Sequence, residues 1–161
     1  MKRPAILALA TAMAASTAAA APRGSPEDRT FHIRLERGAC FGTCPAYSVE
    51  VDADGAVVFQ GQRFVSCLGE RRWGISRRAV VRLVAAADRA DLFALKDEYR
   101  SRITDQPQYR IELTRRGRTK RLTDYVGRSV GMPATVTELE HAVDDIAGTR
   151  ACVTLSKAPN R

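Results

Sequence analysis

The segment Cys40–Tyr47 (CFGTCPAY) constrains the fold of this chain more than any other part of it. Three residues separate its two cysteines, Gly42 lies between them, and Pro45 follows the second one. Apolar and polar residues alternate on both sides, at 31–36 and 47–51, which predicts one half-buried strand before the segment and another after it. We therefore expect a short cysteine-bearing loop between two strands.

The first 20 residues have the features of a secretory signal peptide. Lys2 and Arg3 precede a short apolar run, and small residues end it at Ala20. A retained membrane anchor is the alternative, although the run is short for a membrane span. We predict a signal peptide at 1–20, a disordered leader at 21–29, a single α+β domain at 30–155 and a disordered tail at 156–161. The protein would then be exported, periplasmic or secreted, with no transmembrane segment after cleavage.

The first cysteine is Cys40, well past the predicted cleavage site, so we do not expect a lipoprotein. The whole chain has 26 basic and 18 acidic residues and a formal net charge of +8. Without Lys2 and Arg3 the charge is +6, because 24 basic residues remain against 18 acidic ones. Arginine-rich surfaces suit acidic partners. The richness in Ala and Arg, however, is more typical of a GC-rich coding sequence than of a ligand, and we favour that interpretation.

The rest of the chain predicts an antiparallel sheet of five to six strands with two helices packed on one face. Asp54-Gly55 has the composition of a hairpin turn, with a return strand at 57–59. Weaker strand patterns lie at 63–67 and 72–75. Further strands are expected at 109–113 and 119–125, and a polar connection at 97–106. Helices are predicted from the N-cap Ser76 to about Ala90 and from Pro133 to the cap Gly148.

Cys40, Cys44, Cys67 and Cys152 are an even number of cysteines in a chain predicted to be exported, which indicates two disulfides. Four cysteines allow three pairings, of which we favour Cys40–Cys44 with Cys67–Cys152. Two other uses remain open. A redox pair needs a thiolate at a helix N-terminus, whereas Pro45 leads into a strand. A zinc site would need further ligands, and His32 and His141 are the only histidines.

Two further groups of residues are candidate sites. The predicted hairpin at 115–121 carries Arg115, Arg116 and Arg118, which could bind lipid headgroups or acidic cell-wall polymer or simply form a solvated tip. No aromatic residue interrupts this run, so nucleic acid is an unlikely ligand. Asp105 either pairs with Asp124 as an acid and a base or organises the turn before Pro107. No catalytic or cofactor motif is recognisable, and we expect no cofactor.

The cysteine segment resembles the signature Cys-Phe/Tyr-Gly-x-Cys-Pro-x-Tyr of an uncharacterised family of bacterial domains, many of them exported. Asp54-Gly55, the segment 93–99 (FALKDEY) and Thr104–Pro107 are similar to further elements of that family. The resemblance spans about Thr30 to Ala147 and implies a compact α+β domain without a known activity. It also implies that Cys67 and Cys152 are an addition to the family pattern, which supports pairing them with each other.

These observations favour a non-catalytic exported module that binds an unknown protein or an anionic envelope component. A thiol-disulfide protein that uses Cys40 and Cys44 is one alternative, and a periplasmic inhibitor of a partner enzyme is another. The candidate binding residues are Phe41, Tyr47, Asp105, Arg115, Arg116 and Arg118.

Overall fold

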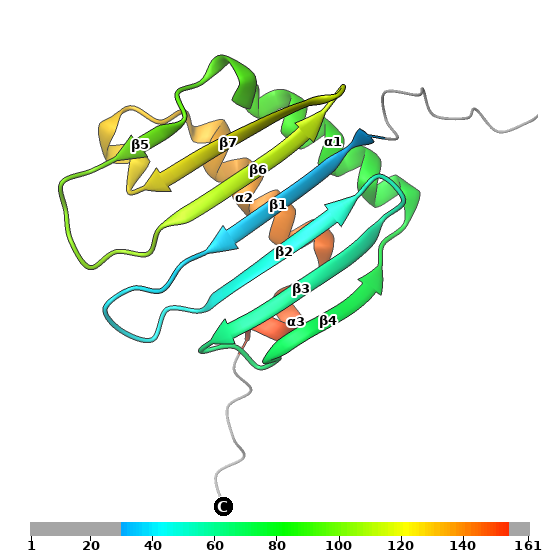
Figure 1. Ribbon diagram of the computed structural model, residues 1–161, viewed down its shortest axis with the longest axis horizontal. Helices are drawn as coiled ribbons and strands as arrows, with labels where there is room; N and C mark the ends of the chain where they lie inside the picture. The colour runs from blue at the N-terminus through cyan, green and yellow to red at the C-terminus, as the bar shows by residue number, and fades with distance from the viewer. Residues whose placement is uncertain (1–29, 155–161) are drawn as a thin grey trace, which may run out of the picture.

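The computed structural model describes residues 30–154, which form one seven-stranded sheet with helices packed on one face (Figure 1). The strand order is β4-β3-β2-β1-β6-β7-β5. The strands are β1 (His32–Arg37), β2 (Ala46–Asp52), β3 (Ala56–Arg63), β4 (Gly69–Gly74), β5 (Glu98–Arg100), β6 (Tyr109–Arg115) and β7 (Arg118–Tyr125). The helices are α1 (Arg77–Ala90), α2 (Ala134–Ala147) and α3 (Arg150–Val153), with short 3-10 turns at Leu92–Ala94 and Gly127–Val130. The predicted signal peptide, leader and tail lie outside the described residues.

The alternating strand patterns place their apolar residues between the sheet and the helices. In β1, Ile33 and Leu35 are fully buried, whereas Arg34 on the opposite face is partly exposed. Burying a Leu or Ile side chain contributes about 1.5–3 kcal/mol, so this face carries most of the stabilisation. The β2–β3 hairpin turns at Gly55, where φ is 85°, a conformation that glycine adopts without a Cβ clash. The α+β class predicted from the sequence is confirmed.

Both long helices begin and end close to where the sequence predicted. Ser76 caps α1, because its side chain accepts a hydrogen bond of 3.2 Å from the backbone N–H of Ala79. Pro133 precedes the first residue of α2, and Gly148 caps its C-terminus. The two helices pack against each other as well as against the sheet.

Several details of the predicted fold are wrong. The sheet has seven strands rather than five or six, and β5 pairs with β7 in parallel, so the sheet is not wholly antiparallel. β5 lies in the segment predicted as a polar connection, and only Tyr99 of its three residues is buried. The expected strand at 63–67 is a turn, since β3 continues to Arg63 before the chain reverses. A third helix, α3, was not predicted.

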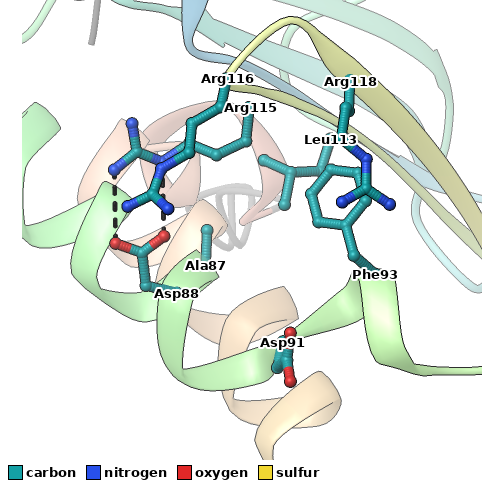
Figure 2. Close-up of a pocket in the computed structure, with 8 residues that line it drawn as sticks. All are labelled: Ala87, Asp88, Asp91, Phe93, Leu113, Arg115, Arg116 and Arg118. Atoms are coloured by element: carbon teal, nitrogen blue, oxygen red, sulfur yellow. Dashed lines mark hydrogen bonds and ion pairs between the residues drawn. The ribbon is translucent and has the colours of Figure 1, made fainter. Parts of the chain in front are cut away.

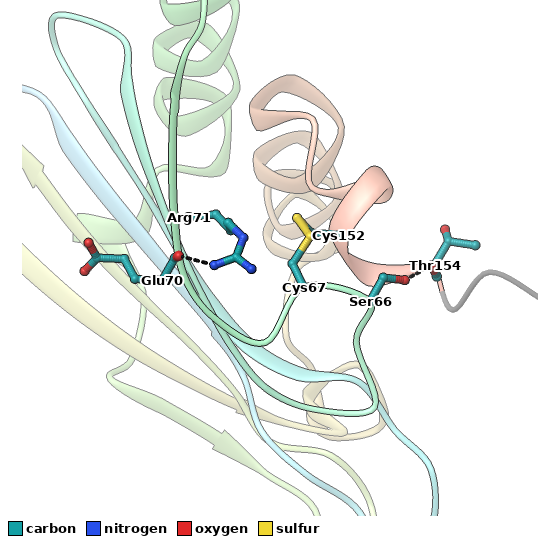
Figure 3. The surroundings of a disulfide bond; sticks show 6 residues. All are labelled: Ser66, Cys67, Glu70, Arg71, Cys152 and Thr154. Carbon is teal, nitrogen blue, oxygen red and sulfur yellow. Dashed lines mark hydrogen bonds between the residues drawn. A yellow bond between two sulfur atoms is a disulfide. The ribbon is translucent and has the colours of Figure 1, made fainter.

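Two disulfides link the cysteines in the pairing that the sequence favoured. Cys67–Cys152 joins the turn after β3 to α3, and Figure 3 shows these two segments side by side. The backbone carbonyl of Cys152 accepts hydrogen bonds from the N–H groups of Ser66, at 2.7 Å, and Cys67, at 3.1 Å. The Ser66 hydroxyl also donates to the carbonyl of Thr154. Closing a span of 85 residues stabilises the fold by about 4 kcal/mol in loop-closure estimates.

Candidate functional site

Five adjacent strands each contribute one polar or aromatic residue to a row across the helix-facing side of the sheet. Arg37 of β1 pairs in register with Tyr47 of β2 on one side and with Tyr109 of β6 on the other. Asp124 of β7 pairs with Tyr109 and with Tyr99 of β5. Residues paired in this way project from the same face of a sheet. We call this set, Tyr47, Arg37, Tyr109, Asp124 and Tyr99, the polar row.

Asp144 of α2 lies over one half of the polar row and uses both of its carboxylate oxygens there. Its Oδ2 accepts from Arg37 Nε at 2.7 Å and lies 2.7 Å from Arg37 Nη2. Its Oδ1 accepts from the Tyr47 hydroxyl at 2.7 Å and from Thr149 Oγ1 at 2.9 Å. The guanidinium of Arg37 also lies 4.5 Å from the centre of the Tyr109 ring. Each oxygen of Asp144 is thus satisfied by donors from other parts of the fold.

The charges of this cluster keep Arg37 ionised and Tyr47 neutral. Burial lowers the pKa of Arg37, but the negative charge of Asp144, its hydrogen bond to Arg37 and the two neighbouring tyrosines together outweigh burial, so the pKa is raised. Burial raises the pKa of Tyr47, and the charge of Asp144 raises it further. Tyr47 is therefore a hydrogen-bond donor to Asp144 and is unsuited to act as a base or a nucleophile near neutral pH.

At the other half of the polar row, the carboxyl of Asp124 lies against a second buried carboxyl group, that of Glu140 on α2. Glu140 lies one turn before Asp144 on α2, and its carboxyl is hydrogen-bonded to Asp124. Burial, followed by the negative charge of Asp124, raises the pKa of Glu140 to about 8. Glu140 is therefore protonated at neutral pH and can donate its proton in a hydrogen bond to Asp124. Asp124 Oδ1 also accepts from the backbone N–H of Gly127 at 2.6 Å, whereas Glu140 Oε1 has no hydrogen-bond partner.

The cysteine loop lies at the end of the sheet that carries the polar row. The N–H of Gly38 donates to the carbonyl of Gln108 at 2.7 Å, and a Cβ at position 38 would come within 2.7 Å of that same oxygen. The N–H of Phe41 donates to the carbonyl of Asp105 at 3.3 Å. The Cys40–Cys44 disulfide closes the loop. The side chain of Phe41, which lies between the two cysteines, is 88% exposed. The loop is therefore held at its base while its aromatic tip faces solvent.

Residues 31–147 match a family described as a domain of unknown function, DUF6438. The chain belongs to this family. The match covers the cysteine loop, the whole polar row and Asp144, so the DUF6438 part of the chain contains nearly all of the arrangement described above. Cys152 and α3 lie beyond the matched residues. No curated protein matches the chain.

The basic hairpin of this DUF6438 domain lies at the other end of the sheet, beside the C-terminal end of α1. Figure 2 shows the cavity there, of about 430 Å³, which Arg115, Arg116 and Arg118 line together with Asp88 and Phe93. Arg115 is almost fully buried and pairs with Asp88, with Nε 3.3 Å from Oδ1. The guanidinium of Arg118 lies 4.7 Å from the centre of the Phe93 ring. The three arginines therefore line a cavity and do not form a fully solvated hairpin tip.

The structure separates the predicted site residues into two groups. Phe41, Tyr47 and Asp105 lie at the cysteine-loop end, whereas the three hairpin arginines lie at the opposite end of the sheet. Asp105 is exposed, and its carboxylate accepts from the Thr104 hydroxyl at 3.1 Å. Asp124 is buried against Glu140 instead. The two aspartates considered as an acid–base pair therefore have different surroundings and different partners.

Sequence reasoning missed Arg37, Glu140 and Asp144, although a signal for the first two was present. Arg37 continues the alternation of Ile33 and Leu35, so it occupies a core-facing position of β1. Glu140 follows Leu139 within the apolar stripe of α2. A charged residue at an apolar position of the pattern indicates a buried ionic or acidic contact. Asp144 carries no such signal, because it lies beside the stripe rather than within it.

Residues 30–154 contain neither a cluster of potential metal ligands nor a helix that could span a membrane. No three His, Cys, Asp or Glu side chains in this part of the chain gather closely enough to hold a metal ion. No helix among the same residues is long and apolar enough to span a membrane. All four cysteines are in disulfides.

Proposed function

We propose that this chain is an exported, non-catalytic interaction module that binds a protein partner through the loop closed by Cys40 and Cys44. The observation that carries the proposal is the 88% exposure of Phe41. Large aromatic side chains are the commonest anchors of protein interfaces. Burying this ring in a partner would contribute about 1.5–3 kcal/mol.

The loop is suited to binding because most of its conformational freedom is already lost in the free protein. The disulfide, the Gly42 N–H donating to the Cys40 carbonyl at 3.0 Å and the Phe41 N–H bonded to Asp105 restrain it at three points. A preorganised loop loses little entropy on association, so more of the contact energy appears as affinity.

Export is supported by two disulfides in a chain whose N-terminus reads as a signal peptide. Disulfides of this kind persist in oxidising compartments and are rare in the cytosol. The redox alternative is disfavoured because Cys44 leads into strand β2 rather than into a helix, so no helix dipole would stabilise a thiolate there. The polar row does not favour an enzyme either, because Asp144 is saturated by donors and Tyr47 stays protonated.

Photo-crosslinking at position 41 tests the proposal. Phe41 is replaced by p-benzoylphenylalanine, and the protein is irradiated in detergent-solubilised envelope extract of the source organism. We expect a discrete cross-linked adduct that an excess of unlabelled wild-type protein abolishes and an excess of Phe41→Ala does not. The matched control carries the same photoreactive residue at Leu68, a 59% exposed apolar position in the turn between β3 and β4, and should give no such adduct.

Two results would contradict the proposal. One is the same set of adducts from positions 41 and 68, which would show non-specific contact. The other is equal competition by wild-type protein and Phe41→Ala, which would show that the aromatic side chain contributes no affinity.

A further inference from the structure

Helix α1 presents four arginines to solvent, namely Arg77, Arg78, Arg82 and Arg89. At 3.6 residues per turn, Arg78, Arg82 and Arg89 fall within about 40° of one another around the helix axis. They therefore form a stripe along the helix, with Ala85 in the gap between the second and the third. We call the four side chains the arginine face.

The arginine face differs from the other charged surface of the domain. On the open side of the sheet, arginines pair with glutamates: Arg34 with Glu50, Arg110 with Glu36 and Arg121 with Glu112. Within residues 30–154, by contrast, none of the four arginines of α1 has an acidic side chain within ion-pair distance. Asp88, the acidic residue within α1, pairs with Arg115. The positive charge of this helix is therefore left without compensation by the domain.

Folding does not account for three of these arginines. Arg89 is the exception, because it lies in the last turn of α1, where the helix dipole favours a cation. Arg77 and Arg78 occupy the first turn of α1, where the positive end of the helix dipole disfavours cations, and this turn has no acidic residue. Arg78 and Arg82 are four residues apart, a spacing at which like charges destabilise a helix. The arrangement opposes helix formation in two independent ways, so an anionic partner is the natural source of compensation.

We propose that the arginine face docks the protein on an anionic lipid surface. Guanidinium groups bind phosphate oxygens with two hydrogen bonds at once, which suits the headgroups of anionic phospholipids. Val81, which is 59% exposed, lies between Arg77 and the stripe and can enter the layer beneath the headgroups. None of the four arginines lines the cavity beside the basic hairpin or the smaller one between Tyr47 and Thr154, so the face would meet its partner as a surface.

The observations favour lipid over the other polyanions. The exposed side of α1 carries no aromatic residue, and single-stranded nucleic acid is bound largely by stacking on aromatic rings. The arginine face is also separate from the cysteine loop. α1 follows β4 and begins at the end of the sheet opposite to that loop (Figure 1). A lipid-bound protein could therefore still present Phe41 to a protein partner.

Vesicle co-sedimentation tests the proposal independently of any protein partner. The disulfide-bonded protein is mixed with phosphatidylcholine vesicles that contain about 30% phosphatidylglycerol, or with phosphatidylcholine vesicles alone. We expect binding only to the anionic vesicles, and we expect it to weaken when NaCl rises from about 0.05 M to about 0.5 M, because salt screens exposed charges. The triple variant Arg78→Gln, Arg82→Gln, Arg89→Gln should lose on the order of a hundredfold in affinity.

The matched control is the triple variant Arg34→Gln, Arg110→Gln, Arg121→Gln, which removes the same number of charges from the open side of the sheet. We expect it to keep nearly all of the affinity, since those arginines are paired with glutamates. Glutamine is about as good a helix former as arginine, and far-UV circular dichroism with thermal unfolding verifies that both variants are folded.

Three results would overturn the proposal. Equal losses in the two triple variants would mean that net charge alone drives the association. Absence of wild-type binding to anionic vesicles at low salt would exclude the lipid surface. Retention on heparin or on an acidic protein column without vesicle binding would assign the arginine face to a different polyanion.

Discussion

Two neighbouring rows of side chains on the same face of the sheet are built on opposite principles. The first, the apolar row, runs across five strands as Phe59, Val49, Leu35, Ile111 and Leu122, none of them more than 1% exposed. On four of the same strands, the polar row lies two residues away from the apolar row, toward the cysteine loop. Its side chains make hydrogen bonds and ionic contacts where the apolar row makes aliphatic ones.

The contrast shows that the two rows contribute differently to the packing of α2 on the sheet. Apolar contacts stabilise any close packing of the helix and have little directional preference. The contacts of Asp144, in contrast, are satisfied only when Arg37, Tyr47 and Thr149 all lie in place. Breaking one partner leaves a charge buried, whereas removing both partners is often close to neutral. We therefore infer that the polar row specifies the position of α2 and that the apolar row supplies most of the stability.

The largest effect is expected from Asp144→Ala. It leaves the Arg37 guanidinium charged and largely buried without its carboxylate, and should lower the free energy of unfolding by about 4 kcal/mol. Urea unfolding measures the loss. The double variant Arg37→Met, Asp144→Leu is the control and should recover most of the stability. A double variant as unstable as the single one would mean that the ion pair itself, rather than the stranded charge, stabilises the fold.

Leu35→Ala tests the apolar row and should be next in size. The substitution leaves a cavity in a fully buried position and should lower the free energy of unfolding by about 3 kcal/mol. Its effect should be the same at pH 5 and pH 9, because no titrating group of the apolar row is involved. A pH-dependent loss would show that the two rows are coupled, contrary to the division drawn above.

Glu140→Gln tests the polar row through the pH dependence of the free energy of unfolding. The pKa of Glu140 is raised from 4.5 to about 8 in the folded protein, so this group stabilises the fold fully below its unfolded pKa. That contribution is lost progressively as the pH rises from about 4.5 to about 8. Glu140→Gln cannot ionise, and we expect it to be more stable than wild type by about 2 kcal/mol at pH 9, with a flatter profile of stability against pH.

Glu138→Gln, on the exposed side of the same helix, is the control for that experiment and should leave the profile unchanged. Thermal unfolding at pH 4.5, 6.5 and 9 measures all three proteins. Parallel profiles for Glu140→Gln and wild type would show that the pKa of Glu140 is not raised in the folded protein.

The smallest effect is expected from Tyr47→Phe. It removes one of two donors to Asp144 Oδ1, while Thr149 continues to bond the same oxygen at 2.9 Å. The free energy of unfolding should fall by about 1 kcal/mol. Combining Tyr47→Phe with Asp144→Ala should add almost nothing to the loss from Asp144→Ala alone, since the partner of the hydroxyl is already gone. Additive losses would place the hydroxyl outside the cluster.

Much of the fold followed from local patterns. Alternation along residues 31–36 and 47–51 predicted β1 and β2, and Ser76 with the stripe behind it predicted α1. Short-range patterns fail where an element is stabilised by its neighbours. β5 is three residues long, buries one side chain and exists because β7 offers it a free edge. The same limit explains why α3 was not predicted. Its four residues are too few to show a helical period, and the Cys67–Cys152 disulfide links them to the turn after β3.

By itself the sequence determined the α+β class, the two long helices and the core-facing side of β1 and β2, and it favoured the pairing of cysteines that the structure contains. These properties depend on residues close together along the chain, whose spacing repeats with the period of a helix or a strand. Only the tertiary structure decided that Arg37 contacts Asp144, 107 residues away, and that the buried carboxyl of Glu140 lies against Asp124. It also decided that the candidate residues divide between two ends of the sheet. The physical reason is that such contacts are set by the strand register and by the placement of α2, which no local period encodes.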